Sequence, residues 1–286
     1  MKLIKGLVKV ANFAVEVPGA FSFTHIVSIL LVVTLTTLLC IYMRDAKDRG
    51  FRIAIGVMCG VMILLEIFKQ TFGCTTLEDG AIIYQYDWNS FPFQLCSTPL
   101  YVLPLLCLLP DCRVRDCAAA YIGTYTLVAG VAVYLTPATV FTEHLFINIQ
   151  TMVHHGLQIV TGMYTLFYYR RRIDRRFFLG GVAVFTVTFA LANLLNTAFY
   201  CILLSRGVID AESAFNMFYI SPYPEQKIPM FNDLLKTVPA VLVIIGYFLL
   251  LTFAAWLVTL AARLLYRYIC ERIGTCEDKD GDATEL

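Results

Sequence analysis

The twenty residues from Thr24 to Met43, THIVSILLVVTLTTLLCIYM, decide the fold class of this chain. They contain no Lys, Arg, Asp or Glu. About 20 predominantly apolar residues in a helix are enough to cross the hydrocarbon core of a bilayer. The stretch therefore predicts a membrane-spanning helix.

Six further segments of similar character fill most of the remaining chain of 286 residues. Hydrophobic residues make up 59% of the sequence and charged residues 15%, whereas soluble domains have about 45–50% and about 25%. This composition excludes a disordered protein, a secreted disulfide scaffold and a soluble enzyme. We predict an all-α, polytopic membrane protein with seven transmembrane helices. They cover residues 24–43, 53–72, 92–110, 117–136, 146–168, 179–203 and 237–262.

The segment before the first span is amphipathic. Lys2, Lys5 and Lys9 recur at helical spacing, and apolar residues fill the other face. Such a pattern predicts a helix that lies in the membrane interface, here over residues 1–17. We expect the seven-helix domain to cover residues 18–270 and a disordered, polar cytoplasmic tail to cover residues 271–286.

The distribution of Lys and Arg sets the orientation. Alternate connections and the C-terminal tail carry fifteen of these residues on one side of the membrane, and the other side carries six. Cytoplasmic loops hold the excess of positive charge, so the N-terminus is predicted outside and the C-terminus in the cytoplasm. We expect the cysteines on the cytoplasmic side to stay reduced.

Several classes of ligand have no signal in the sequence. The formal net charge is +1 and no basic domain stands out, so no nucleic acid partner is expected. There is no Cys-x-x-Cys pair and no His/Cys spacing typical of zinc sites. We therefore expect no metal and no cofactor.

Polar residues interrupt four of the predicted spans, close to their outer ends. Because neighbouring spans run in opposite directions, these residues converge on one slab about 5–15 Å below the outer surface. A charge inside a bilayer costs about 2.5–3.5 kcal/mol on insertion scales, so such groups face each other or a wet cavity. The pattern predicts an outward-opening polar pocket. Its residues are Glu66, Lys69, Gln94, Cys96, Gln150, His154, Asn193 and Asn196.

Cys96 and His154 are the residues of this set with the clearest catalytic chemistry. A thiol needs a base or an electropositive setting to become a nucleophile, and a helix start near Cys96 favours a thiolate or an oxyanion. Structural roles stay open for the others: an internal ion pair for Glu66 and Lys69, and hydrogen bonds between helices for the asparagines. His154 alone fits a structural role as well as a functional one.

Short motifs resemble a known family. The run FPFQLCS at residues 91–97 resembles the LPLHLCS signature of the YwaF-like integral membrane proteins, which are related to the transmembrane protein 164 acyltransferase family. Residues 130–156, with QTMVHHG at their end, resemble the fifth-helix region of that family. Asn193 and Asn196 resemble its sixth-helix Asn, and NMFYISP at residues 216–222 resembles a motif of its last outer loop.

The resemblance covers roughly residues 50–260 and implies a Cys nucleophile with a His base that moves fatty acyl chains between lipids. Carried over, Cys96 is the acyl acceptor and His154 the base. The chain departs from the family at two places. Gln94 stands where many relatives have His, and Ser221 stands in the region where a Lys-Pro pair is usual.

The leading hypothesis is a phospholipid acyltransferase or transacylase that opens to the outer leaflet, with phospholipid or lysophospholipid as substrate. The amides that position the substrate or stabilise the oxyanion are predicted to be Gln94, Gln150, Asn193, Asn196 and Asn216. Lys69 is predicted to meet the headgroup phosphate, with Glu66 orienting it. We expect a multi-pass protein of a bacterial plasma membrane. A solute or lipid transporter, a seven-helix receptor and a scaffold with a purely structural polar cluster remain open alternatives.

Overall fold

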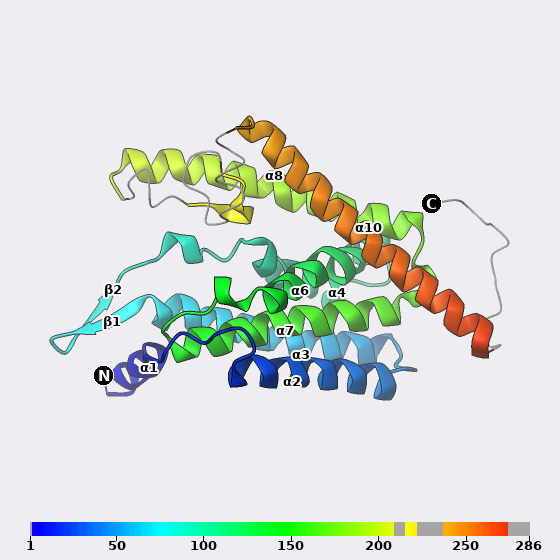
Figure 1. Ribbon diagram of the computed structural model, residues 1–286, viewed down its shortest axis with the longest axis horizontal. Coiled ribbons are helices and arrows are strands. Elements are labelled where there is room, and N and C mark those ends of the chain that lie inside the picture. Colours follow the sequence, from blue (N-terminus) through cyan, green and yellow to red (C-terminus); the bar gives the residue numbers. More distant parts are fainter. Residues whose placement is uncertain (1, 209–214, 222–236, 274–286) are drawn as a thin grey trace.

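The computed structural model describes residues 2–208, 215–221 and 237–273. The expected cytoplasmic tail lies almost wholly outside these residues. The chain forms an elongated bundle of helices, with the N-terminus at one end and the connections richest in arginine at the other (Figure 1). The mainly helical fold expected for a membrane protein is confirmed.

Five helical segments in the described residues are long and apolar enough to cross a membrane. Two of them contain a π-helical turn, η1 (Lys69–Gly73) after α3 and η4 (Ile122–Thr126) between α5 and α6. The segments are α2 (Phe23–Tyr42), α3 with η1 (Asp48–Gly73), α5 to α6 (Arg113–Leu135), α8 (Arg175–Ser205) and α10 (Ala240–Ile273).

The other two predicted spans form helices of a different kind. α7 (Leu145–Tyr168) has 24 residues, but its many buried polar side chains set it apart from the five apolar segments. α4 (Pro99–Leu108) has only 10 residues, because a 3-10 turn, η3 (Leu95–Ser97), occupies the start of the predicted span. The described residues therefore support five of the seven spans by length and composition.

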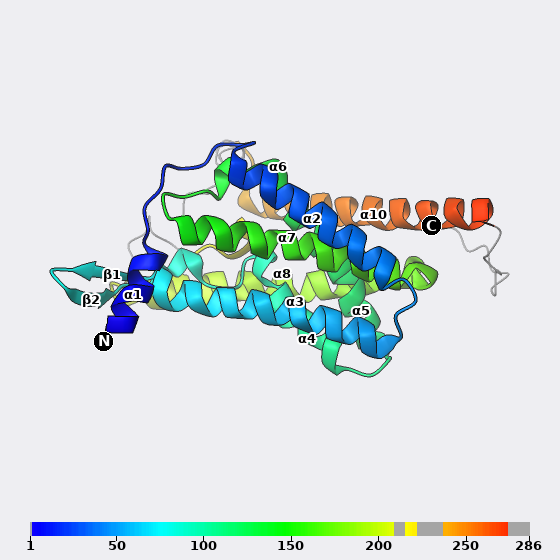
Figure 2. The same cartoon turned by 90° about the horizontal axis from the view of Figure 1, so that it is seen from below.

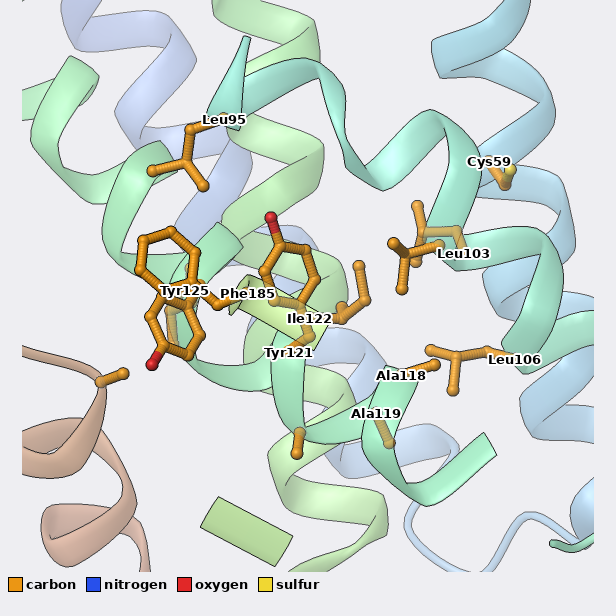
Figure 3. Packing of buried hydrophobic residues seen from close by; sticks show 14 of the residues in the cluster. Cys59, Leu95, Leu103, Leu106, Ala118, Ala119, Tyr121, Ile122, Tyr125 and Phe185 are labelled. Atoms are coloured by element: carbon orange, nitrogen blue, oxygen red, sulfur yellow. The ribbon is translucent and has the colours of Figure 1, made fainter. Parts of the chain in front are cut away.

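α7 is the central helix of the bundle. It lies between α2 and α3 (Figure 2) and also packs on α6 and η4. Glycines let the backbones approach closely: a Cβ atom on Gly130 of α6 would lie 2.9 Å from the carbonyl oxygen of His155 on α7. Next to this contact, Tyr121, Tyr125 and Phe185 form part of a stacked aromatic core (Figure 3).

The end of the bundle that holds the N-terminus carries a β-hairpin, which the sequence analysis did not predict. Its strands are β1 (Thr75–Glu78) and β2 (Ala81–Tyr84). α1 (Lys2–Ala11) lies beside it, and the Asn12 Nδ2 atom donates a hydrogen bond of 2.7 Å to the Thr75 carbonyl. α1 is therefore tied to the hairpin and ends earlier than the predicted residue 17.

The opposite end of the bundle is held by arginines. Arg172, between α7 and α8, donates two hydrogen bonds to the carboxylate of Asp111, between α4 and α5. Arg115 of α5 is 2% exposed and forms an ion pair of 2.5 Å with Asp48 of α3.

Successive connections lie at alternating ends of the bundle (Figures 1 and 2). The expectation of reduced cysteines is wrong for Cys270 at this end, which is disulfide-bonded.

Candidate functional site

Cys96 is the middle residue of the 3-10 turn η3, and α4 begins three residues later at Pro99. Pro99 starts α4, since proline has a helical φ and no N–H that would need a partner there. The Thr98 hydroxyl bonds the Leu95 carbonyl at 2.7 Å and the Tyr121 hydroxyl of α5 at 2.8 Å. The turn is thereby fixed on both sides of Cys96, a residue of intermediate burial.

The imidazole of His154 contacts the backbone of Cys96. Its Nε2 atom lies 2.8 Å from the Cys96 carbonyl oxygen. A carbonyl oxygen only accepts hydrogen bonds, so Nε2 carries the proton and Nδ1 holds a free lone pair. Nδ1 is buried and has no hydrogen-bond partner. The ring is therefore held as a neutral base with its basic nitrogen unoccupied.

Gln158, one turn further along α7, donates a second hydrogen bond to the same Cys96 carbonyl. Two side chains of α7 thus hold the backbone of the cysteine. Within the described residues, the hydrogen bond from the His154 ring goes to this carbonyl, and no hydrogen bond joins Nδ1 to the Cys96 sulfur. A proton transfer from the thiol requires the sulfur to rotate towards Nδ1 or one water between them.

A charged cluster lies beside this pair. Glu66 is 5% exposed, and its carboxylate is 2.8 Å from the Lys69 ammonium, 2.7 Å from the Gln70 amide nitrogen and 3.4 Å from that of Gln150. Lys69 begins the π-helical turn η1, and such turns are frequent at functional sites. Gln150 lies one helical turn before His154 on α7, so its contact with Glu66 places the cluster close to His154.

Three amides hold a turn of the connection between α8 and α10 against the bundle. Asn196 of α8 accepts a bond of 2.6 Å from the Met217 N–H and donates one of 3.0 Å to the Met217 carbonyl. Gln94 donates to the Asn216 carbonyl and accepts from the Phe218 N–H, both at 2.8 Å. Asn216 accepts a bond from the Ser221 N–H at 2.9 Å.

This amide clamp (Gln94, Asn196 and Asn216) holds a strained backbone. The turn η7 (Met217–Tyr219) places Phe218 at φ 58° and Tyr219 at φ 56°. The left-handed region costs a non-glycine residue on the order of 1–3 kcal/mol and persists only where the surroundings impose it.

The predicted site residues therefore fall into three linked groups and one outlier. Cys96 meets His154, Glu66 meets Lys69 and Gln150, and the amide clamp bonds backbone. Asn193 lies apart, because its amide donates to the Phe189 carbonyl of its own helix at 3.2 Å. The spacing of four residues places Gln150, His154 and Gln158 on one helix face. That spacing predicts the position of Gln158, but sequence reasoning assigned it no role in the site.

A separate apolar groove of about 520 Å³ lies between α2, α6, α7 and α10. Ile159 and Met163 line it from α7. Neither Cys96 nor His154 belongs to its lining, so the groove is distinct from the site.

The sequence pattern that defines the TMEM164 family matches residues 20–259. The chain belongs to the TMEM164 family. No curated protein and no solved structure matches the chain. The segment that matches the TMEM164 family contains Cys96, His154, the Glu66 cluster and the amide clamp. Membership supports a multi-pass membrane protein and is consistent with acyltransferase chemistry; the narrower resemblance to YwaF-like proteins stays a prediction.

Proposed function

We propose that this protein is a membrane-embedded acyltransferase that moves a fatty acyl chain between phospholipids through a thioester on Cys96. One observation carries the proposal: His154 is fixed on the Cys96 residue through Nε2, and its Nδ1 is buried and unpartnered. A base that is oriented by its other nitrogen on the residue that carries the thiol is an arrangement suited to nucleophilic catalysis. Membership in the TMEM164 family supports the same chemistry.

The first half of the reaction forms the thioester. Nδ1 of His154 takes the thiol proton, and the Cys96 sulfur attacks the ester carbonyl carbon of a phospholipid. The ester C–O bond breaks, and the leaving lysolipid oxygen takes the proton from His154. In the second half, an acceptor lysolipid hydroxyl gives its proton to Nδ1 and attacks the thioester. The C–S bond breaks, and the sulfur takes the proton back.

The neighbouring groups would position the substrate. We assign Lys69 to the headgroup phosphate and assign Glu66 to orienting Lys69, supported by their ion pair of 2.8 Å. Gln150 links this pair to α7. The amide clamp and Asn193 remain proposed substrate-positioning residues, but the clamp amides act on an oxyanion only after they release the 216–221 turn.

The proposed topology has seven crossings, with the N-terminus outside and the C-terminus in the cytoplasm. α4 and α7 cross together with the five apolar segments in this proposal. Two observations support it: connections alternate between the ends of the bundle, and arginines concentrate at the end opposite the N-terminus. A bacterial plasma membrane stays the proposed location.

The decisive experiment measures acylation of Cys96. The purified protein in detergent micelles receives a phospholipid with a labelled acyl chain, and intact-mass spectrometry detects the acyl adduct. Cys96→Ser and His154→Ala are expected to abolish transfer to a lysolipid. Cys201→Ser and His155→Ala serve as matched controls, because Cys201 is exposed and His155 bonds its own helix through Nδ1. Transfer that survives in both site variants refutes the mechanism.

The transporter and receptor alternatives make a different prediction. An activated Cys96 reacts with an acyl-mimic electrophile much faster than the exposed Cys201. Equal and slow modification of the two thiols would favour a binding protein with a structural polar cluster.

A further inference from the structure

α7 carries buried polar atoms for which the described protein offers no partner. They are the His154 Nδ1, the Gln158 Oε1, the Tyr164 hydroxyl and the Thr165 hydroxyl. The last three belong to residues that are 0% exposed. A buried polar atom left without a hydrogen bond costs about 1–3 kcal/mol. Four such atoms on one helix call for a common explanation.

Three of these residues lie along one face of α7. His154, Gln158 and Thr165 are four and seven residues apart, close to one and two helical turns. The face extends for about 16 Å from His154 towards the arginine-rich end of the bundle, at 1.5 Å per residue. Tyr164 adjoins Thr165 at the far end of this line.

The end of the line at Tyr164 lies close to the ion pair of Arg115 and Asp48. The Tyr164 ring is 5.5 Å from the Phe51 ring, and the Arg115 guanidinium is 5.7 Å from the centre of the same Phe51 ring. Arg115 is paired with Asp48, whose side chain is 47% exposed. The line thus leads from the candidate base to charged groups that meet solvent.

Buried water is the usual partner of otherwise unsatisfied polar atoms in protein interiors. We propose that His154, Gln158, Thr165 and Tyr164 bind a line of water, and that the water at its outer end hydrolyses the acyl thioester on Cys96. The protein would then release free fatty acid in addition to transferring acyl chains. This activity rests on the proposed function, whereas the water line does not.

The hydrolytic step uses the same base as the transfer. Nδ1 of His154 takes a proton from the water, and the water oxygen bonds to the thioester carbonyl carbon. The C–S bond breaks, and the sulfur takes the proton from His154. The products are a free thiol and a fatty acid, which balances atoms and charge.

The first test locates the water without any assay of activity. X-ray hydroxyl-radical footprinting modifies side chains next to bound water, including buried ones. Tyr121 is the matched control, because it is equally buried but its hydroxyl bonds Thr98 at 2.8 Å. We expect Tyr164 to be modified several times faster than Tyr121. Equally slow modification of both tyrosines overturns the water line.

The second test measures fatty acid release and acyl transfer in parallel. Thr165→Val replaces the unpartnered hydroxyl by a methyl group of similar size. We expect fatty acid release to fall roughly tenfold, the change in rate that corresponds to about 1.4 kcal/mol, while transfer to a lysolipid stays unchanged. Thr161→Val is the control, because the Thr161 hydroxyl already bonds the Leu157 carbonyl at 2.7 Å.

The outcomes separate this inference from the proposed function. Transfer without any release of fatty acid by the wild-type protein refutes the hydrolytic step and leaves the acyltransferase intact. An equal loss of release in Thr165→Val and Thr161→Val also refutes it. If Cys96 never becomes acylated, the proposed function fails, hydrolysis fails with it, and footprinting alone decides the water line.

Discussion

The amide of Asn196 gives the sharpest structural prediction. Its side chain is 1% exposed and makes two hydrogen bonds to the backbone of Met217, at 2.6 and 3.0 Å. Asn196→Ala removes both and leaves a buried N–H and a buried carbonyl without their partner. At about 1–3 kcal/mol for each group, the expected loss is about 2–6 kcal/mol. The left-handed backbone at Phe218 and Tyr219 also loses a constraint.

The assay is hydrogen exchange of the 216–221 turn in detergent micelles, together with the unfolding temperature. The turn amides of Asn196→Ala should exchange faster by the factor that this free energy sets, at least about 25-fold at 1.4 kcal/mol for each factor of ten. Asn193→Ala is the matched control on the same helix, because within the described residues the Asn193 amide bonds the Phe189 carbonyl of α8 and not the turn. Protection of the turn that is equal in the two variants would refute the clamp.

Three further predictions concern other contacts of the bundle. Gly130→Ala places a methyl group 2.9 Å from the His155 carbonyl, so we expect a loss of about 1–3 kcal/mol of unfolding free energy, whereas Gly60→Ala, where the Cβ meets nothing within 4 Å, should have little effect. Glu66→Leu leaves the Lys69 ammonium, whose side chain is only 20% exposed, without its partner and should cost up to about 3–5 kcal/mol. The double change Glu66→Leu with Lys69→Met should recover most of the lost thermal stability; a double variant no more stable than the single one contradicts the pairing. The hydrogen bonds from Arg172 hold the pKa of Asp111 below its usual value, so the pair stabilises the fold above the unfolded pKa of about 3.9 and loses this effect as the pH falls through the lowered folded value; Asp111→Asn should flatten that part of a melting-temperature profile, and an unchanged profile would contradict it.

The parts of the fold that the sequence predicts best depend on local composition. α2 has no charged residue, so its length and character follow from the sequence alone. α7 was predicted as a helix at almost the observed boundaries. Its position at the centre of the bundle, which buries its polar side chains, could not be predicted from its own sequence. α4 is shorter than expected because the turn that contains Cys96 uses the first residues of the span.

The β-hairpin has a sequence signal, the Asp79-Gly80 pair, that a search for hydrophobic segments does not detect. Asp79 and Gly80 both have positive φ, at 48° and 77°, and an Asp-Gly pair between two short strands is a known hairpin signal. The strands have four residues each, so a search for long apolar segments passes over them.

The candidate site shows a limit of another kind. Depth along the helices predicted that Cys96, His154 and the amides share one slab. It could not predict which atoms pair, because a 3-10 turn directs the Cys96 carbonyl at His154 and a left-handed turn occupies Gln94 and Asn196. Those contacts depend on backbone conformations outside regular helices, where depth and periodicity carry no information.

The two hydrogen bonds from α7 to the Cys96 carbonyl have a mechanical consequence. Membranes that differ in thickness change the tilt of the helices that cross them. Because His154 and Gln158 both donate hydrogen bonds to the Cys96 carbonyl, a tilt of α7 carries that peptide unit with it. The imidazole and the peptide unit of Cys96 therefore move together when the surrounding bilayer deforms.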